Sequence, residues 1–148
     1  MDIIMERDGL MNLVHLSNLM QNWGFEVHPN HYFMFEGYLT EMLKKDRVMV
    51  VWNGPFIEAV ILFYLTNNYE KLYKKSMWQV VQDDENGSQL YIDKMICRHW
   101  TKGLRENIQR AIQEKFPQIK EAYYHRAPKD RCVKINRRER YELQSTVS

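Results

Sequence analysis

The sequence predicts an α/β (α+β) protein with one mixed, mostly antiparallel sheet flanked by helices, formed by a single domain over residues 1–148. The length of 148 residues is that of one typical domain, and a hydrophobic content of 45% is enough for a packed core. Segments with helical spacing of apolar residues occur together with short β-branched runs, as in helices packed on a sheet. A strand, a loop, a helix and a second strand follow one another over residues 89–126, the order of a parallel crossover connection.

Two helices are expected before the first pair of strands. Asp8 can cap the first helix, in which apolar residues between Leu10 and Met20 follow helical spacing and which Gly24 ends. The second helix is expected to begin near Asn30, a good N-cap residue that follows a proline. The apolar residues of this second helix are Phe33, Phe35, Leu39, Met42 and Leu43.

The middle of the chain predicts an antiparallel hairpin and two short elements. Val48–Trp52 and Phe56–Leu65 are apolar runs rich in β-branched residues, and the Asn-Gly-Pro sequence between them is a turn signal. Asn67–Lys75 is predicted to form a short helix, and Met77–Val81 is predicted to form a strand.

The C-terminal half predicts the parallel pair. Gln89–Cys97 is a strand, Thr101–Phe116 is an amphipathic helix closed by a proline, and Ile119–His125 is a second strand parallel to the first. Cys132–Asn136 alternates between apolar and polar residues and is expected to form an edge strand. We expect residues 141–148 to fray.

Composition excludes several classes of protein. No apolar run approaches the roughly 18–20 residues that span a bilayer, so no membrane span is expected. The N-terminus, MDIIMERDG, has acids where a signal peptide has a basic leader, and a cytoplasmic location is the default. The two cysteines, Cys97 and Cys132, form no CxxC pair, which argues against a metal site and a disulfide scaffold. The surplus of Met and aromatic residues would allow a homodimer.

The charge is concentrated near the C-terminus. The chain has a net charge of +2, but the stretch from Arg126 to Arg140 holds seven basic residues and two acids, a local charge of +5. Such a strip is either a solvated basic tail or a contact for phosphate. The phosphate would belong to the prosthetic group of an acyl carrier, to coenzyme A or to nucleic acid.

Asp93 lies in the middle of a predicted strand. Carboxylates are poor strand residues, so Asp93 either lies on a solvated face or serves a function. The basic loop that follows runs directly into a helix, whose first N–H groups favour anions. A carboxylate beside such a helix start suits group transfer from a phosphorylated carrier. The candidate carrier-binding residues are Arg98, Trp100, Thr101, Lys102, Gly103 and Leu104.

This order of elements resembles the GNAT acyltransferase superfamily over most of the chain. In that superfamily, early helices and a hairpin precede a strand, a loop-to-helix turn that holds the carrier's phosphates, and a parallel strand. The turn there carries a Gln or Arg followed by Gly-x-Gly or Gly-x-Ala. The turn in this chain, from Arg98 to Leu104, departs from that pattern because it holds a single glycine, Gly103.

The chain also resembles one group within that superfamily, the RTX-toxin-activating lysine acyltransferases, which use acyl-acyl-carrier protein. Their pattern has an early His, a hairpin, an aromatic-apolar-Ile-Asp strand, a loop ending in Asn-Gly, a helix ending in Lys-Phe-Pro and an apolar strand ending in Arg. One departure is Pro29 after the early histidine, where the family usually has Arg. The matching residues are His28, the Val48–Leu65 hairpin, Leu90-Tyr91-Ile92-Asp93, Lys102-Gly103, Lys115-Phe116-Pro117, and Arg126 with Lys129.

This resemblance implies transfer of an acyl group from a phosphopantetheine-type carrier, either acyl-carrier protein or coenzyme A, to a protein or small amine such as a lysine. The family's catalytic pair falls on His28 and Asp93. His28 would remove the acceptor's proton, and Asp93 would orient the imidazole or accept that proton. The structural alternatives are an ordinary helix-terminal histidine and an exposed aspartate. His31 is the second candidate base, and no third ligand accompanies the two histidines to suggest a metal.

Further interpretations remain open. Trp100 and His99 either stack on the donor or fill the space that a missing glycine leaves, and a filled turn would indicate a site without catalysis. Cys97 and His99 are two apart on a strand and form a much weaker nucleophile–base candidate. The alternative function is a non-catalytic GNAT-fold binding protein or phage accessory protein, with a basic strip that contacts nucleic acid.

Overall fold

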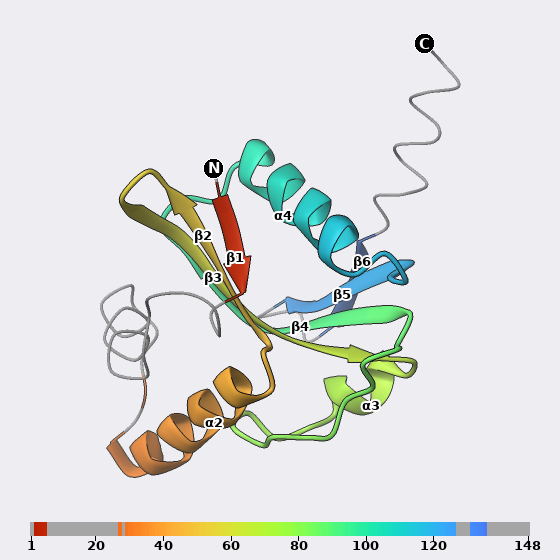
Figure 1. The fold of residues 1–148 in the computed structure, drawn as a ribbon. Helices are drawn as coiled ribbons and strands as arrows, with labels where there is room; N and C mark the ends of the chain where they lie inside the picture. Colours follow the sequence, from red (N-terminus) through yellow and green to blue (C-terminus); the bar gives the residue numbers. More distant parts are fainter. Residues whose placement is uncertain (1, 6–26, 28, 127–130, 136–148) are drawn as a thin grey trace.

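The structure is a computed structural model that describes residues 2–5, 27, 29–126 and 131–135 (Figure 1). Its strands are β1 (Asp2–Met5), β2 (Val48–Asn53), β3 (Phe56–Thr66), β4 (Gln89–Cys97), β5 (Glu121–Arg126) and β6 (Arg131–Ile135). Its helices are α2 (Tyr32–Lys44), α3 (Tyr69–Tyr73) and α4 (Lys102–Lys115), and the 3-10 turn η2 (Pro29–His31) precedes α2. The helix predicted around residues 10–20 and the tail at 141–148 lie outside the described residues.

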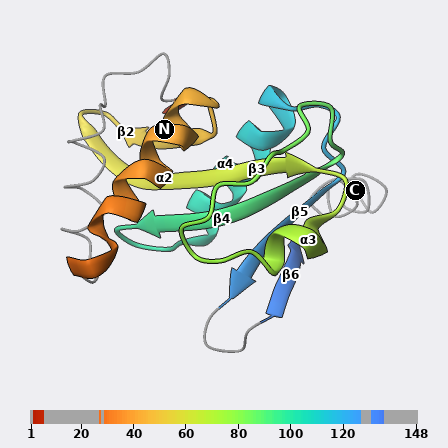
Figure 2. The same cartoon turned by 90° about the horizontal axis from the view of Figure 1, so that it is seen from below.

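The described strands form one sheet in the order β1-β2-β3-β4-β5-β6 (Figures 1 and 2). All neighbouring pairs are antiparallel except β4 and β5, which are parallel and joined through α4. The predicted mixed, mostly antiparallel α/β fold and its parallel pair are therefore confirmed. The strand β1, which pairs with the edge of β2, has no counterpart in the sequence-based prediction.

Helices cover both faces of the sheet, with α2 and α3 on one face and α4 on the other (Figure 1). Side chains alternate along β2, so Val48 and Val50 pack toward α2, whereas Met49 and Val51 pack toward α4. Burial from both sides explains why β2 and β3 read as nearly continuous apolar runs rather than as alternating ones.

The helix predicted to start near Asn30 begins slightly later. Residues 29–31 form η2, and His31 is the N-cap residue of α2, without a side-chain capping hydrogen bond. Phe33 is 90% exposed, so it does not belong to the core face as its apolar character suggested. The buried stripe follows the i, i+3, i+4, i+7 spacing of a helix on a sheet, and it consists of Phe35, Tyr38, Leu39 and Met42.

The predicted strand at Met77–Val81 is wrong. β3 pairs with β2 along one edge and with β4 along the other. Neither edge of β3 is therefore free to pair with a strand formed by residues 77–81. The chain between α3 and β4 instead crosses the α2 face of the sheet as a loop. Its apolar residues still reach the core, where Trp78 is buried.

A buried ion pair fixes this loop on the sheet. Arg47 Nε donates to Oδ2 of Asp83 at 2.5 Å, and the two side chains are 6% and 8% exposed. The same carboxylate oxygen accepts a hydrogen bond from the backbone N–H of Leu65 at 3.2 Å. Because the loop is tied at this point, Lys75 and Trp78 are held against the α2 face of the sheet.

Candidate functional site

A β-bulge lies at Asp93. Leu62 on β3 pairs with Lys94, whereas the next residue, Phe63, pairs with Ile92, so Asp93 is the extra residue of the bulge. A bulge breaks the strict alternation of side chains and re-aims them. As a result the consecutive side chains of Asp93 and Lys94 both make their contacts on the α2 face.

Asp93 is a buried carboxylate at the centre of a small polar cluster. The Tyr38 hydroxyl donates to its Oδ2 at 2.5 Å, and Lys75 Nζ lies 3.0 Å from the same oxygen. The side chains of Lys75 and Asp93 are 4% and 5% exposed. The interpretation of Asp93 as an aspartate on an exposed face is therefore wrong.

Lys75 is saturated as a hydrogen-bond donor. Beyond Asp93, its ammonium donates to the backbone carbonyls of Ser76 at 3.1 Å and Met77 at 3.3 Å. It also lies 5.4 Å from the centre of the Tyr38 ring, a cation–π distance. An ammonium with three acceptors is well matched to a buried position, so Lys75 serves as the fixed counterion of Asp93.

The two oxygens of Asp93 are used differently. Both Tyr38 and Lys75 engage Oδ2, and no hydrogen bond from the described residues reaches Oδ1. Oδ1 therefore retains its capacity to accept a proton or to orient an imidazole. A carboxylate that acts on a substrate needs one oxygen available for proton transfer while the other oxygen holds the side chain in place.

Lys94 extends over the indole ring of Trp78, with its Nζ 5.5 Å from the ring centre. Burial lowers the pKa of this half-buried amine, and the positive charge of Lys75 lowers it further, while the negative charge of Asp93 opposes both effects. Burial also raises the pKa of Tyr38 and of Tyr64, and the charge of Asp93 raises both further.

An open groove lies beside the cluster, between α2 and the loop that carries Trp78. Its volume is about 420 Å³, which is within the usual range of small-molecule sites. Tyr38 lies in its wall, so the groove adjoins the residue that donates to Asp93. The lining residues are Phe33, Met34, Gly37, Tyr38, Thr40, Glu41, Trp78 and Val80.

The strands β4 and β5 separate at the level of Asp93. They pair from Gln89–Glu121 to Ile92–Tyr124 and no further, although both strands continue beyond this point. Figure 2 shows the two strands diverging. The second half of β4 therefore pairs with β3 along one edge, and β5 does not pair with its other edge. Ligands of open α/β sheets bind at the carboxyl ends of such strands.

The N-terminus of α4 follows β4 directly. Thr101 is its N-cap, and its Oγ1 accepts the N–H of Leu104 at 3.1 Å, so this amide is already used within the helix. Lys102 is 84% exposed and lies 4.0 Å from Glu106. The amides of Lys102 and Gly103 remain at the first turn as the donors for an anion.

Three further predictions concern residues in or next to this turn: Trp100, Arg98 and the Cys97–His99 pair. Trp100 is 49% exposed, so it does not fill the turn as a buried plug. Arg98 is exposed, and its backbone N–H donates to Glu58 on the neighbouring strand at 3.0 Å. Burial raises the pKa of the Cys97 thiol, which disfavours the thiolate and argues against a Cys97–His99 nucleophile pair.

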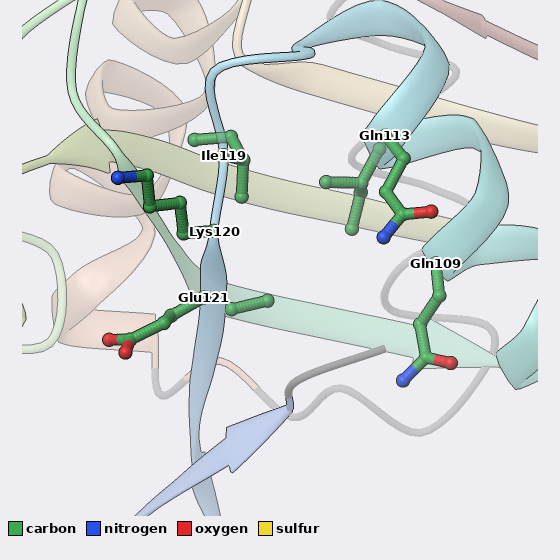
Figure 3. A pocket seen from close by; sticks show the side chains of 7 residues that line it. Gln109, Gln113, Ile119, Lys120 and Glu121 are labelled. Atoms are coloured by element: carbon green, nitrogen blue, oxygen red, sulfur yellow. The ribbon is translucent and has the colours of Figure 1, made fainter. Parts of the chain in front are cut away.

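A second cavity lies between α4 and the start of β5. Figure 3 shows Gln109 and Gln113 on α4 across from the segment 119–121, whose Lys120 and Glu121 side chains point away from the helix. The volume of about 20 Å³ is room for about one water molecule. This cavity therefore cannot take an acyl chain.

The sequence located Asp93 but missed most of its surroundings. Tyr38 carried a signal, since it completes the helical spacing of the buried stripe on α2. Lys75 and Trp78 carried none, because their positions depend on how the loop folds back. His28 lies outside the described residues, so its pairing with Asp93 stays a prediction; the other candidate base, His31, is exposed.

No protein-family model matches this chain, and no curated protein shows significant similarity to it. Among the described residues, no group of three or more His, Cys, Asp or Glu side chains is arranged to hold a metal ion. In the same part of the chain, no helix has the length and apolar character needed to cross a bilayer.

Proposed function

We propose that this protein transfers an acyl group from a phosphopantetheine-type thioester, carried by acyl-carrier protein or coenzyme A, to a protein or small amine such as a lysine. The observation that carries the proposal is the position of Asp93. This anchored carboxylate lies where β4 loses its pairing with β5, on the strand that leads to the N-terminus of α4.

In the proposed reaction, the acceptor amine loses a proton and attacks the thioester carbonyl. The new C–N bond forms, the C–S bond breaks, and the carrier leaves as a thiol after taking up a proton. Asp93 Oδ1 serves as the proton acceptor or holds the imidazole of His28, which then takes the proton. Tyr38 and Lys75 keep the carboxylate in place through Oδ2.

The donor's phosphates are proposed to bind at the first turn of α4. The amides of Lys102 and Gly103, the positive end of the helix dipole, and the side chains of Arg98 and Lys102 provide the attraction. Room for a phosphate at Gly103 is supported by its open surroundings, since a Cβ placed there would meet nothing closer than Thr101 Oγ1 at 4.0 Å.

The test of catalysis is mass spectrometry of an amine acceptor after incubation with acyl-carrier-protein and coenzyme A thioesters. Asp93→Asn should lower the rate of transfer by orders of magnitude, because it keeps the shape but removes the charge. Glu114→Gln, a change of an exposed carboxylate on α4, is the matched control and should leave the rate unchanged. Equal rates for Asp93→Asn and the unaltered protein would contradict the proposed role.

The test of the donor site is titration with coenzyme A and with phosphopantetheine-loaded carrier protein. Lys102→Glu should weaken binding by about 1–3 kcal/mol, the range of a charge-assisted hydrogen bond, because repulsion replaces attraction. Lys71→Glu on α3 makes the same charge change at another exposed residue and should have little effect. If the unaltered protein binds neither coenzyme A nor the loaded carrier protein, the proposed donor site is excluded.

A second candidate function is a non-catalytic binding protein of the same fold, such as a phage accessory protein. The burial of Asp93 with Tyr38 and Lys75 favours it, because a structural ion pair has the same features. Most of the basic strip from Arg126 to Arg140, which would contact nucleic acid, lies outside the described residues. Failure of acyl transfer with every donor, together with binding of nucleic acid that weakens with salt, would favour this function.

A further inference from the structure

The dipeptide Asn-Gly occurs twice in this chain, at Asn53–Gly54 and at Asn86–Gly87. An asparagine followed by glycine is chemically labile, because glycine has no side chain to keep its backbone nitrogen away from the asparagine carboxamide. Both pairs lie in turns: the first joins β2 to β3, and the second precedes β4. The two sites share the reactive dipeptide, so the turns around them decide how readily each one reacts in the folded protein.

The turn at Asn86–Gly87 is held by several contacts. The N–H of Gly87 donates to the backbone carbonyl of Asp84 at 2.9 Å, and the N–H of Asn86 donates to Oδ1 of the same aspartate at 2.9 Å. Gly87 is buried, and a Cβ placed on it would lie 2.5 Å from the backbone nitrogen of Thr66. The amide nitrogen of Gly87 therefore cannot turn toward the Asn86 side chain unless these contacts open first.

The turn at Asn53–Gly54 has none of these restraints. Both residues are exposed at the tip of the β2–β3 hairpin (Figure 1). Among the described residues, none forms a hydrogen bond with the Gly54 N–H or with the Asn53 carboxamide. A Cβ placed on Gly54 would meet no atom within 4 Å, so the surroundings leave room for the peptide group to rotate. Opening of this turn disturbs only the last pair of the ladder, Asn53 with Phe56.

We propose that Asn53–Gly54 is a site of spontaneous deamidation and isoaspartate formation in the folded protein. Hydroxide removes the proton of the Gly54 amide, and the nitrogen forms a bond to Cγ of Asn53. The bond from Cγ to the side-chain nitrogen then breaks, and that nitrogen leaves as ammonia after taking up a proton from water. Water adds to one of the two carbonyl carbons of the resulting cyclic imide and opens the ring to aspartate or to isoaspartate.

The reaction alters both the charge and the backbone of the hairpin turn. Either product has a carboxylate in place of a neutral carboxamide, which lowers the net charge of +2 by one unit. Isoaspartate also adds a methylene group to the backbone where β2 turns into β3. Neither step uses an acyl donor or Asp93, so the reaction is independent of the proposed acyl transfer.

The experiment is incubation of the full chain at pH 8, followed by brief digestion with trypsin and mass spectrometry with fragmentation of the peptides. Tryptic cleavage places Asn53 and Asn86 in different peptides, so the second site is the internal reference. The rate at each site is divided by its rate in protein unfolded with guanidinium chloride, which removes the effect of the flanking sequence.

The expected ratio follows from the hydrogen bonds of the second turn. Its opening breaks the two bonds to Asp84, and each bond lowers the open population about fivefold. We therefore expect the normalised rate at Asn53 to be at least about tenfold higher than the normalised rate at Asn86. A smaller ratio overturns the proposal.

The variant Asn53→Gln makes the test specific. Glutamine keeps a carboxamide in the turn, but its extra methylene group requires a larger ring, which forms far more slowly. Conversion at residue 53 should therefore cease, whereas conversion at Asn86 should not change. The more acidic form of the chain that ion exchange resolves during the incubation should be lost at the same time. If this acidic form appears at the same rate in Asn53→Gln, another residue is its source and the proposal is wrong.

Discussion

At the scale of single residues, the cluster around Asp93 shows how one carboxylate can be both buried and available. Its Oδ2 is held by Tyr38 and Lys75, and its Oδ1 receives no hydrogen bond from the described residues. A buried ion pair adds little net stability, but removal of one partner leaves a charge without compensation. The consequences of single changes in this cluster should therefore be large and asymmetric.

We expect Lys75→Met to lower the free energy of unfolding by about 3–5 kcal/mol, the usual cost of leaving a buried charge unpaired. Chemical denaturation at pH 7 measures this change. Lys74→Met changes the exposed neighbour and should stay within about 0.5 kcal/mol. The double change Lys75→Met with Asp93→Leu should cost less than Lys75→Met alone, because no charge remains buried. A loss below about 1 kcal/mol for Lys75→Met would mean that Lys94 replaces it as the counterion.

At the scale of elements, two glycines differ in what surrounds them. A Cβ added at Gly87, just before β4, would lie 2.5 Å from the backbone nitrogen of Thr66. A Cβ added at Gly37, within α2, would meet no atom within 4 Å. The first position holds the turn that starts β4 against β3, whereas the second is an ordinary helix position.

Gly87→Ala is expected to destabilise the fold by about 1–3 kcal/mol, because the backbone of Thr66 must move to admit a methyl group. Gly37→Ala is expected to stabilise it by about 1 kcal/mol through the higher helix propensity of alanine. Thermal unfolding of both variants measures the two changes. Equal effects of the two substitutions would show that the close approach at Gly87 does not exist.

The start of α4 gives a third prediction. Thr101→Ala removes the acceptor for the Leu104 N–H and should cost about 1 kcal/mol. Thr101→Ser retains the hydroxyl and should preserve most of the stability. Urea unfolding of the two variants separates the capping bond from the methyl group. An alanine variant as stable as the serine variant would show that the hydroxyl of Thr101 contributes nothing as a cap.

At the scale of the whole molecule, the half-buried amine of Lys94 and the buried phenols of Tyr38 and Tyr64 make the free energy of unfolding depend on pH in the alkaline range. The pKa of Lys94 is lower in the folded protein than its ordinary value of 10.5, so between these two values the unfolded chain binds more protons. Stability therefore rises with pH across that window. The pKa values of Tyr38 and Tyr64 are raised above 10.0, so the unfolded chain loses their protons first and stability falls above that pH.

In the Lys94→Met variant, we expect the free energy of unfolding to lack the increase with pH that the lowered pKa of Lys94 produces. The difference in unfolding free energy between this variant and the unaltered protein should shift in favour of the unaltered protein as the pH rises from 7 toward 10.5. Lys102→Met, which makes the same change at a side chain that is 84% exposed, is the control. Denaturation curves at several pH values test this. A pH-independent difference for Lys94→Met would contradict the effect of burial on its pKa.

The sequence by itself determined the fold class and most of the elements. Apolar runs and spacings located β2, β3, β4, α4 and β5, because a chain of this composition must bury those faces and each element has its own period. The same local signals singled out Asp93, since a carboxylate in an apolar strand is unusual at the level of sequence alone.

Only the tertiary structure decided how Asp93 is used. The bulge that brings Asp93 and Lys94 to one face depends on the register with β3. The positions of Lys75 and Trp78 depend on a loop held by the Arg47–Asp83 contact, whose partners are 36 positions apart along the chain. The predicted strand at 77–81 is wrong for the same reason, because β3 already pairs with β2 and β4 and has no free edge for it. Local propensity determines whether a segment forms a helix or a strand. Competition for sheet edges and for space in the core determines which side chains come into contact.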